Sequence, residues 1–213
     1  GGKLQVKSGS RTMTLSFKGK VAGDKLSGTV TVNGREYQLS NVTSTDGHYW
    51  NAHNLGSWSW GNGGNFQEDP NFLFEGIALR FNFPSPTSSW MAFHWNGQTY
   101  TSDVVSAVFK HKELVSELEE WQFSAEFPQV KFTGRMTARP EDMILLTHPM
   151  PDGSFLYTTI TPRADLVIDV QELRQNGWES VQRLTASSTC PFEVTKSVRN
   201  EKVQREFLII DAA

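Results

Sequence analysis

Cysteine is almost absent from this chain of 213 residues, which contains only Cys190. A single cysteine excludes an internal disulfide framework and leaves the redox compartment open. Basic residues are not in excess, since 20 Lys and Arg stand against 23 Asp and Glu and the formal net charge is -3. Because Lys and Arg are scattered rather than clustered, we do not expect a nucleic acid as a partner.

Long apolar runs, nucleotide-binding motifs and zinc-binding spacings are also missing. No apolar run approaches the ~18 residues that span a bilayer, so we expect no stable membrane span. The chain has no P-loop, no Gly-x-Gly-x-x-Gly after a strand and no Gly-x-Ser-x-Gly elbow. Asp46, His48 and His53 would together make only a weak metal site. We therefore expect neither a cofactor nor a resident metal ion.

Aromatic residues, in contrast, are plentiful. The chain contains 14 Phe and 7 Trp, and many of the tryptophans fall between Trp50 and Trp95. Large aromatic side chains cluster either in the core of a β-protein or around a ligand cavity. We expect the strands to enclose an aromatic-lined cavity that holds an apolar small molecule.

Short runs that alternate apolar and polar residues predict a protein built from β-strands. Leu26–Val32 is followed by Asn33-Gly34, and Trp90–Trp95 by Asn96-Gly97; both pairs predict tight hairpin turns with positive φ. Further predicted strands are Thr12–Phe17, 35–40, 72–83, 98–101, 103–110, 120–125, 131–138, 143–148, 155–161, 164–172, 178–186, 192–196 and 205–210. The one predicted helix is Lys112–Glu119, because Leu114 and Leu118 are four residues apart among charged residues.

This pattern predicts an all-β, antiparallel fold, either a barrel or a barrel-like sandwich of two sheets. No linker divides the chain, so residues 1–213 are expected to form a single β domain. Gly1-Gly2 without an initiator Met resembles a processed end. Residues 1–10 are accordingly expected to be either an ordered strand or the remnant of a tag.

Residues 46–66 combine polar groups and large aromatics more densely than the rest of the chain. In an extended segment, alternation puts His48 and Trp50 on one face and Tyr49 and His53 on the other. Trp58 and Trp60 also share a side. One of these faces is expected to line the cavity.

The same region resembles the tocopherol cyclase and carotenoid 1,2-hydratase group of lipocalin-like proteins, to which the fungal decalin-forming Diels-Alderases are also similar. That group carries a motif of the type Tyr-His-Asp-His-Asn-Trp-Gly followed by Trp-x-Trp. This chain reads Trp-Asn-Ala-His-Asn-Leu-Gly over residues 50–56 and then Trp-Ser-Trp-Gly over residues 58–61. The resemblance implies a lipocalin-like (calycin) barrel or barrel-like sandwich.

The departures from that motif concern its polar groups. Asn51 stands at the first His position, Ala52 at the Asp position and Leu55 at the Trp position. The role of the missing carboxylate is either lost in this chain or taken by Asp46, His48 or Glu75. A lost carboxylate favours a carrier or a pericyclic cyclase over acid-catalysed hydration.

The resemblance implies a cofactor-independent cyclase or isomerase that acts on an apolar polyene, isoprenoid or polyketide-derived molecule. Such a reaction needs a proton donor, a dry pocket and aromatic faces that stabilise developing positive charge. The candidate catalytic residues are His53, Asn54 and Glu75. The candidate substrate-binding residues are His48, Tyr49, Trp50, Trp58, Trp60 and Trp95.

Each of these assignments has an alternative. His48 and His53 are also consistent with loop histidines bonded to backbone groups, the tryptophans with core positions, and Glu75 with the solvent face of its strand. His94 and His148 are expected at the surface. For the whole protein the alternatives are a non-catalytic lipid or pigment carrier and a carbohydrate-binding β domain, because exposed Trp faces stack on sugar rings.

Overall fold

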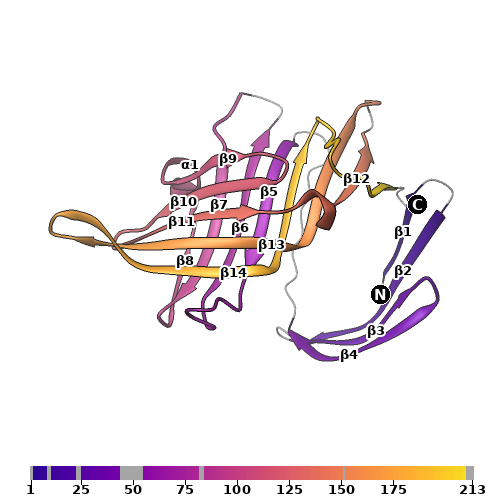
Figure 1. Ribbon diagram of the computed structural model, residues 1–213, viewed down its shortest axis with the longest axis horizontal. Coiled ribbons are helices and arrows are strands. Elements are labelled where there is room, and N and C mark those ends of the chain that lie inside the picture. The colour runs from indigo at the N-terminus through magenta and orange to yellow at the C-terminus, as the bar shows by residue number, and fades with distance from the viewer. Residues whose placement is uncertain are drawn as a thin grey trace.

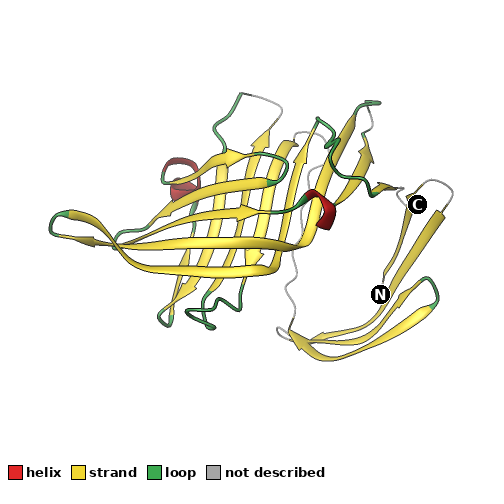
Figure 2. Ribbon diagram, viewed as in Figure 1, coloured by secondary structure: helices red, strands yellow, loops and turns green. Residues whose placement is uncertain are grey.

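The computed structural model describes residues 2–8, 11–22, 25–43, 55–81, 84–150 and 152–209. The first strands are β1 (Gly2–Ser8), β2 (Arg11–Ala22), β3 (Lys25–Val32), β4 (Arg35–Thr43), β5 (Leu55–Gly63), β6 (Leu73–Phe81), β7 (Ser88–Trp95) and β8 (Gln98–Thr101). They are followed by α1 (Val104–Phe109), β9 (His111–Ser116), β10 (Glu120–Glu126), β11 (Val130–Thr137), the 3-10 turn η1 (Pro140–Asp142), β12 (Ile144–Pro149), β13 (Phe155–Arg174), β14 (Gly177–Lys196) and β15 (Glu206–Ile209). Figure 1 shows these elements along the chain, and Figure 2 shows how strands dominate them.

The prediction of an all-β, antiparallel protein is confirmed. Every strand pair in the described part of the chain is antiparallel except β12 with β15. The strands follow the order β4-β3-β2-β1-β15-β12-β13-β14-β5-β6-β7-β8, with β9, β10 and β11 branching from β13. Over these residues the path stays open at β4 and β8 and does not close into a barrel.

The long hairpin of β13 and β14 joins two stacked layers. One layer continues from β14 into β5, β6, β7 and β8, and the other from β13 into β11, β10 and β9 (Figure 1). Aromatic rings meet between the layers: Phe74 stacks on Phe123 with 4.5 Å between ring centroids, and Phe93 stacks on Phe132 at 4.1 Å. These four side chains are at most 3% exposed, so packed aromatic rings fill the space between the layers here.

Both predicted Asn-Gly hairpins are confirmed. Asn33 and Gly34 have φ of 49° and 81° between β3 and β4, and Asn96 and Gly97 have φ of 50° and 73° between β7 and β8. Asn and Gly tolerate positive φ, which gives these turns the twist that antiparallel strands need.

Two neighbouring predictions are wrong. Residues 103–110, expected as a strand, contain helix α1, because the Asp103 side chain and Ser106 form a reciprocal capping box. Most of β9 (His111–Ser116) falls within residues 112–119, which were expected as a helix, because this segment pairs along β10. The predicted strands 155–161 and 164–172 are joined in β13, and 178–186 and 192–196 are joined in β14.

The strands β1–β4 form a curved sheet that is attached to the two layers through β15 (Figure 1). Of residues 27–40, none is buried. No helix in the described residues is long and apolar enough to cross a membrane.

Candidate functional site

His48, Tyr49, Trp50, His53 and Asn54 lie outside the described residues. They directly precede β5 in the sequence, whose first residue is Leu55. The described part of the candidate site consists of β5 and the strands that pair with it, β14 and β6.

Trp58 and Trp60 lie on the same side of β5, as predicted. Ser59, Gly61 and Gly63 alternate with them and are buried on the core side. A Cβ atom at Gly61 would lie 2.3 Å from Met136 Sδ, so this side of β5 has no room for a large side chain. Trp58 and Trp60 are therefore half-buried on the side of the sheet that points away from the aromatic core, which we call the outer face.

The strand register extends the outer face into a row of side chains. Trp60 is opposite Glu193 of β14 on one side and Ile77 of β6 on the other, and Ile77 is opposite Trp90 of β7. Residues opposite each other in antiparallel strands have neighbouring side chains on one face. The row therefore reads Glu193, Trp60, Ile77, Trp90 across four strands.

Glu75 and Trp95 occupy different surroundings. Glu75 is exposed on the outer face, where its Oε1 lies 3.4 Å from the Nε1 of Trp60. Trp95 is 5% exposed on the core side of β7 and donates from Nε1 to Gln182 Oε1 at 2.8 Å. The structure thus brings Trp58, Trp60 and Glu75 together on one face and leaves Trp95 on the other.

Glu193 is the acidic residue of this face that the sequence analysis missed. Trp58 donates from Nε1 to its Oε1 at 2.6 Å. Burial raises the pKa of the Glu193 carboxyl, because the carboxylate loses hydration, while the hydrogen bonds from Trp58 and Thr195 lower it in part. This carboxyl group therefore keeps its proton to a higher pH than an ordinary glutamic acid does.

A signal for Glu193 exists in the sequence. It is the one acidic residue in the run Pro-Phe-Glu-Val-Thr over residues 191–195. That pattern is similar to the one that singled out Glu75 in an apolar strand. Only the strand register distinguishes the two, because it places Glu193 in a central strand beside Trp58 and Glu75 on an open surface.

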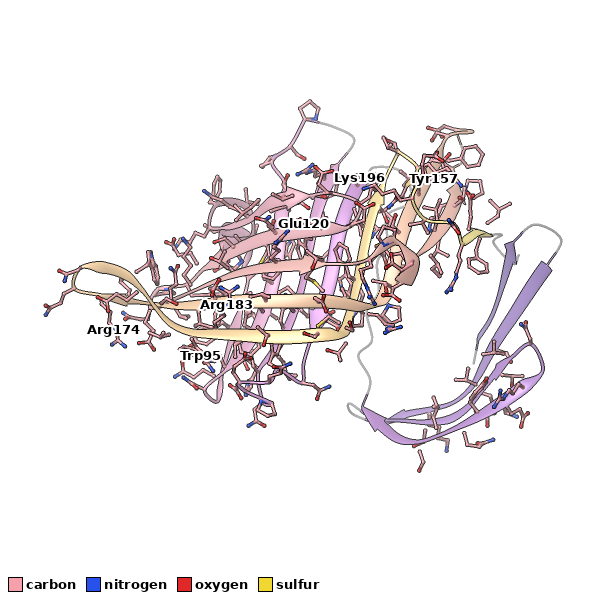
Figure 3. The ribbon with its side chains drawn as sticks, viewed as in Figure 1. Trp95, Glu120, Tyr157, Arg174, Arg183 and Lys196 are labelled. Atoms are coloured by element: carbon pink, nitrogen blue, oxygen red, sulfur yellow. The ribbon has the colours of Figure 1, made fainter. Side chains whose placement is uncertain are left out.

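A second polar cluster lies on the core side of the same strand ends. Ser59 donates to Glu113 Oε1 at 2.7 Å, and Arg80 pairs with Glu113 Oε2 at 2.6 Å. The Glu113 side chain is only 2% exposed. Lys196 donates from Nζ to the backbone oxygen of Ser116, and Figure 3 shows Lys196 at the end of the sheet opposite Trp95. These contacts hold β9 against β5 and β14.

Two adjoining depressions open on the outer face of β5–β8. The smaller, of about 280 Å³, is lined by Trp60, Glu75, Gly76, Ile77, Trp90, Met91, Ala92, Thr101 and Ser102. The larger, of about 600 Å³, is lined by Asn62, Gly63, Gly64, Asn65, Leu73, Phe74, Glu75, Ala92, Phe93, His94 and Thr99. Glu75 and Ala92 line both, so the depressions meet along these two residues.

Metal and thiol chemistry have little support in the described part of the chain. No group of three His, Cys, Asp or Glu side chains there is arranged to hold a metal ion. Cys190 is buried, and burial raises the pKa of its thiol to about 11. A thiol with so high a pKa is a poor nucleophile.

Comparisons of the chain with protein-family models, with curated proteins and with solved structures find no match. Glu193 and Trp58 lie at the centre of the outer face, and the chemistry of this face is the basis for assigning a function.

Proposed function

We propose that this protein is a cofactor-independent cyclase or isomerase that protonates an apolar polyene, isoprenoid or polyketide-derived molecule with the carboxyl group of Glu193. The observation that carries the proposal is the desolvated Glu193 carboxyl, which is bonded to Trp58 and adjacent to Trp60. A neutral carboxylic acid is a proton donor, and donors of this kind contribute about 10²–10⁴-fold to a rate.

The surroundings of Glu193 suit a cationic intermediate. Along its row Glu193 lies between Ile160 of β13 and Trp60 of β5. An apolar neighbour limits water, and indole faces stabilise positive charge. The smaller depression continues from Trp60 to Trp90, which gives an extended apolar chain a surface on which to lie.

In this proposal, Glu193 replaces the carboxylate that the motif lacks in this chain. Ala52 stands at the Asp position of the tocopherol cyclase type of motif, and Glu193 supplies a carboxyl group beside the Trp-x-Trp part of the same motif. His53 and Asn54 keep their proposed roles as polarising and orienting groups. We also propose that the antiparallel fold is a lipocalin-like sandwich.

The test separates binding from turnover. All-trans-retinol fluorescence reports binding of a polyene, and incubation with farnesol and geranylgeraniol in D₂O, followed by mass spectrometry, reports cyclic products that carry one deuterium. We expect Glu193→Gln to bind retinol as the wild type does and to lose about 10²–10⁴-fold of the turnover. Glu179→Gln, on the exposed part of the same strand, is the matched control and is expected to keep full turnover.

The other possible outcomes test the role of Glu193, the carrier alternative and the role of His53. Full turnover by Glu193→Gln contradicts the role of Glu193. Binding without turnover by the wild type supports the carrier alternative. Loss of turnover in His53→Ala at unchanged retinol binding supports the proposed part of His53.

The outer face also favours a second candidate, a carbohydrate-binding β domain. Trp60 is half-buried and Trp90 is 36% exposed, and the depressions around them carry the polar side chains of Asn62, Glu75 and Thr101. Two indoles flanked by hydrogen-bonding groups suit sugar rings. Calorimetric titration with soluble oligosaccharides tests this candidate: binding that Trp90→Ala weakens supports it, and the absence of binding contradicts it.

A further inference from the structure

Helix α1 exposes apolar side chains to solvent. Val104, Val105 and Phe109 are 67%, 62% and 72% exposed, and Val108 is half-buried. Ala107 is the buried residue of this helix, which packs against β7 and β9 at the margin of the strands (Figure 2). We call the four residues Val104, Val105, Val108 and Phe109 the α1 patch.

Helical geometry makes the α1 patch continuous. At 3.6 residues per turn, its residues cover an arc of about 140° in the order Val104, Val108, Val105 and Phe109. Ala107 lies outside this arc, on the side of the strands. Single exposed apolar residues are ordinary on protein surfaces, whereas a continuous exposed patch marks an interaction surface.

Two lysines border the α1 patch. Lys110 is the C-cap of α1 and directly follows Phe109, and Lys112 is the second residue of β9. Both lysines are exposed. Neither of them forms an ion pair with another residue in the described part of the chain. Their charges are therefore free to act on a partner outside the protein.

The acidic side chains of residues 103–113 do not offset these lysines. Asp103 caps the first turn of α1, at the opposite end of the helix from Lys110, and its Oδ1 accepts from the backbone N–H of Ser106 at 2.7 Å. The side chain of Glu113 is only 2% exposed and is already ion-paired. The C-terminal border of the α1 patch is therefore positively charged.

We propose that α1 docks on the surface of an anionic lipid bilayer. Apolar side chains of such a helix enter the boundary between headgroups and acyl chains, and lysines beside them bind anionic headgroups. Lys110 and Lys112 can reach the headgroups because their long apolar stems lie along the boundary. A protein partner fits less well, because lysine is depleted in protein–protein interfaces.

The docked helix would lie next to the smaller depression of the outer face. Thr101 and Ser102, which line that depression together with Trp60 and Trp90, directly precede Asp103 at the start of α1. An apolar substrate would then pass from the bilayer to the outer face without crossing water. This delivery role rests on the proposed function, whereas binding of α1 to the bilayer does not.

Vesicle flotation tests the docking without any substrate. We expect the wild type to bind vesicles of phosphatidylcholine mixed with phosphatidylserine. Phe109→Ser should weaken this binding by about tenfold or more, and Val105→Ser by about threefold or more, because less apolar surface leaves water. Val198→Ser is the matched control, because Val198 is 63% exposed outside the α1 patch, and it should bind as the wild type does.

The lysines are tested separately. Lys110→Gln and Lys112→Gln should each weaken binding to the anionic vesicles by about fivefold. Equal binding of the wild type to vesicles of phosphatidylcholine alone would contradict the role of the lysines.

Three results would overturn the docking itself. They are absence of binding by the wild type, unchanged binding by both Phe109→Ser and Val105→Ser, and a wild-type dimer in light scattering that Phe109→Ser converts to a monomer. The last result would show that a second copy of the chain covers the α1 patch. Failure of the proposed function is distinguishable, because it appears in the turnover of Glu193→Gln and not in vesicle binding.

Discussion

At the scale of single residues, the molecule balances two opposing effects on Glu193. Burial disfavours its carboxylate, and the N–H group of Trp58 and the hydroxyl of Thr195 favour it. Burial is the larger effect, so the pKa of the Glu193 carboxyl is raised and its acid form persists to a higher pH than in an ordinary glutamic acid. A neutral acid beside aromatic rings is the combination that protonation of an alkene requires.

Replacing Glu193 by Gln is expected to change how stability depends on pH. The folded pKa of Glu193 is raised above the ordinary value of 4.5, so the unfolded chain releases this proton first as the pH rises. The free energy of unfolding of the wild type therefore falls as the pH rises above 4.5. It stops falling once the pH has passed the pKa of Glu193 in the folded protein. The free energy of unfolding of Glu193→Gln minus that of the wild type should therefore increase with pH over this window. The increase should be at most about 1.4 kcal/mol per pH unit.

Urea denaturation at a series of pH values measures this difference. Glu179→Gln, at an exposed position on the same strand, is the control for the loss of one carboxyl group. A difference for Glu193→Gln that shrinks as the pH rises would mean that the folded pKa is lowered instead.

At the scale of elements, local chemistry determined some segments and long-range pairing determined others. The Asn-Gly hairpins were predictable because positive φ is a local requirement. Helix α1 was missed although Asp103 and Ser106 form its capping box, because a short apolar segment is ambiguous between strand and helix. Strand β9 was missed because its pairing with β10 is invisible in its own charged sequence.

The cluster around Glu113 is expected to hold β9 against β5. Glu113→Ala removes the partner of Arg80 and Ser59 and should lower the free energy of unfolding by about 1–3 kcal/mol. Arg183→Ala breaks an exposed ion pair with Asp169 and should cost about 1 kcal/mol or less. Equal losses in the two variants, measured by urea denaturation, would show that the Glu113 cluster contributes no more than a surface pair.

Close packing of β11 against Phe123 gives a second prediction at this scale. A Cβ atom at Gly134 would lie 2.1 Å from Phe123 Cζ, and Phe123 is itself stacked on Phe74. Gly134→Ala should therefore cost about 1–3 kcal/mol through overpacking. At Gly64 the nearest atom is the tip of Leu73 at 3.3 Å, so Gly64→Ala is the control with the smaller expected loss. Thermal unfolding of both variants distinguishes them, and an unchanged midpoint for Gly134→Ala would contradict this packing.

At the scale of the whole molecule, the two layers and the curved sheet of β1–β4 differ in burial. The layers contain an aromatic core, whereas residues 27–40 of β3 and β4 include no buried side chain. Few buried apolar contacts imply a low free energy of local opening. Amide hydrogen exchange should therefore be faster in β3 and β4 than in residues 164–170 of β13, and equal protection would contradict this difference.

The candidate site shows how much of the function could be predicted from sequence. Trp58 and Trp60 were expected to share one side if their segment was extended, and they do so in β5, although no strand had been predicted over those residues. The choice of face was not predictable, because it depends on Met136 and Leu166 filling the space above Gly61 and Gly63. Glu193 lies 135 residues from Trp58, so only the pairing of β14 with β5 brings them together.

The most direct test of the central claim is a titration of the Glu193 carboxyl group. Its ¹³C chemical shift, assigned by comparison with Glu193→Gln, reports the pKa in the folded protein. We predict a midpoint clearly above 4.5, and a still higher one in Trp58→Phe, which keeps the ring but removes the N–H donor. A midpoint at or below 4.5 would contradict the account, because burial would then not favour the protonated form of the Glu193 carboxyl.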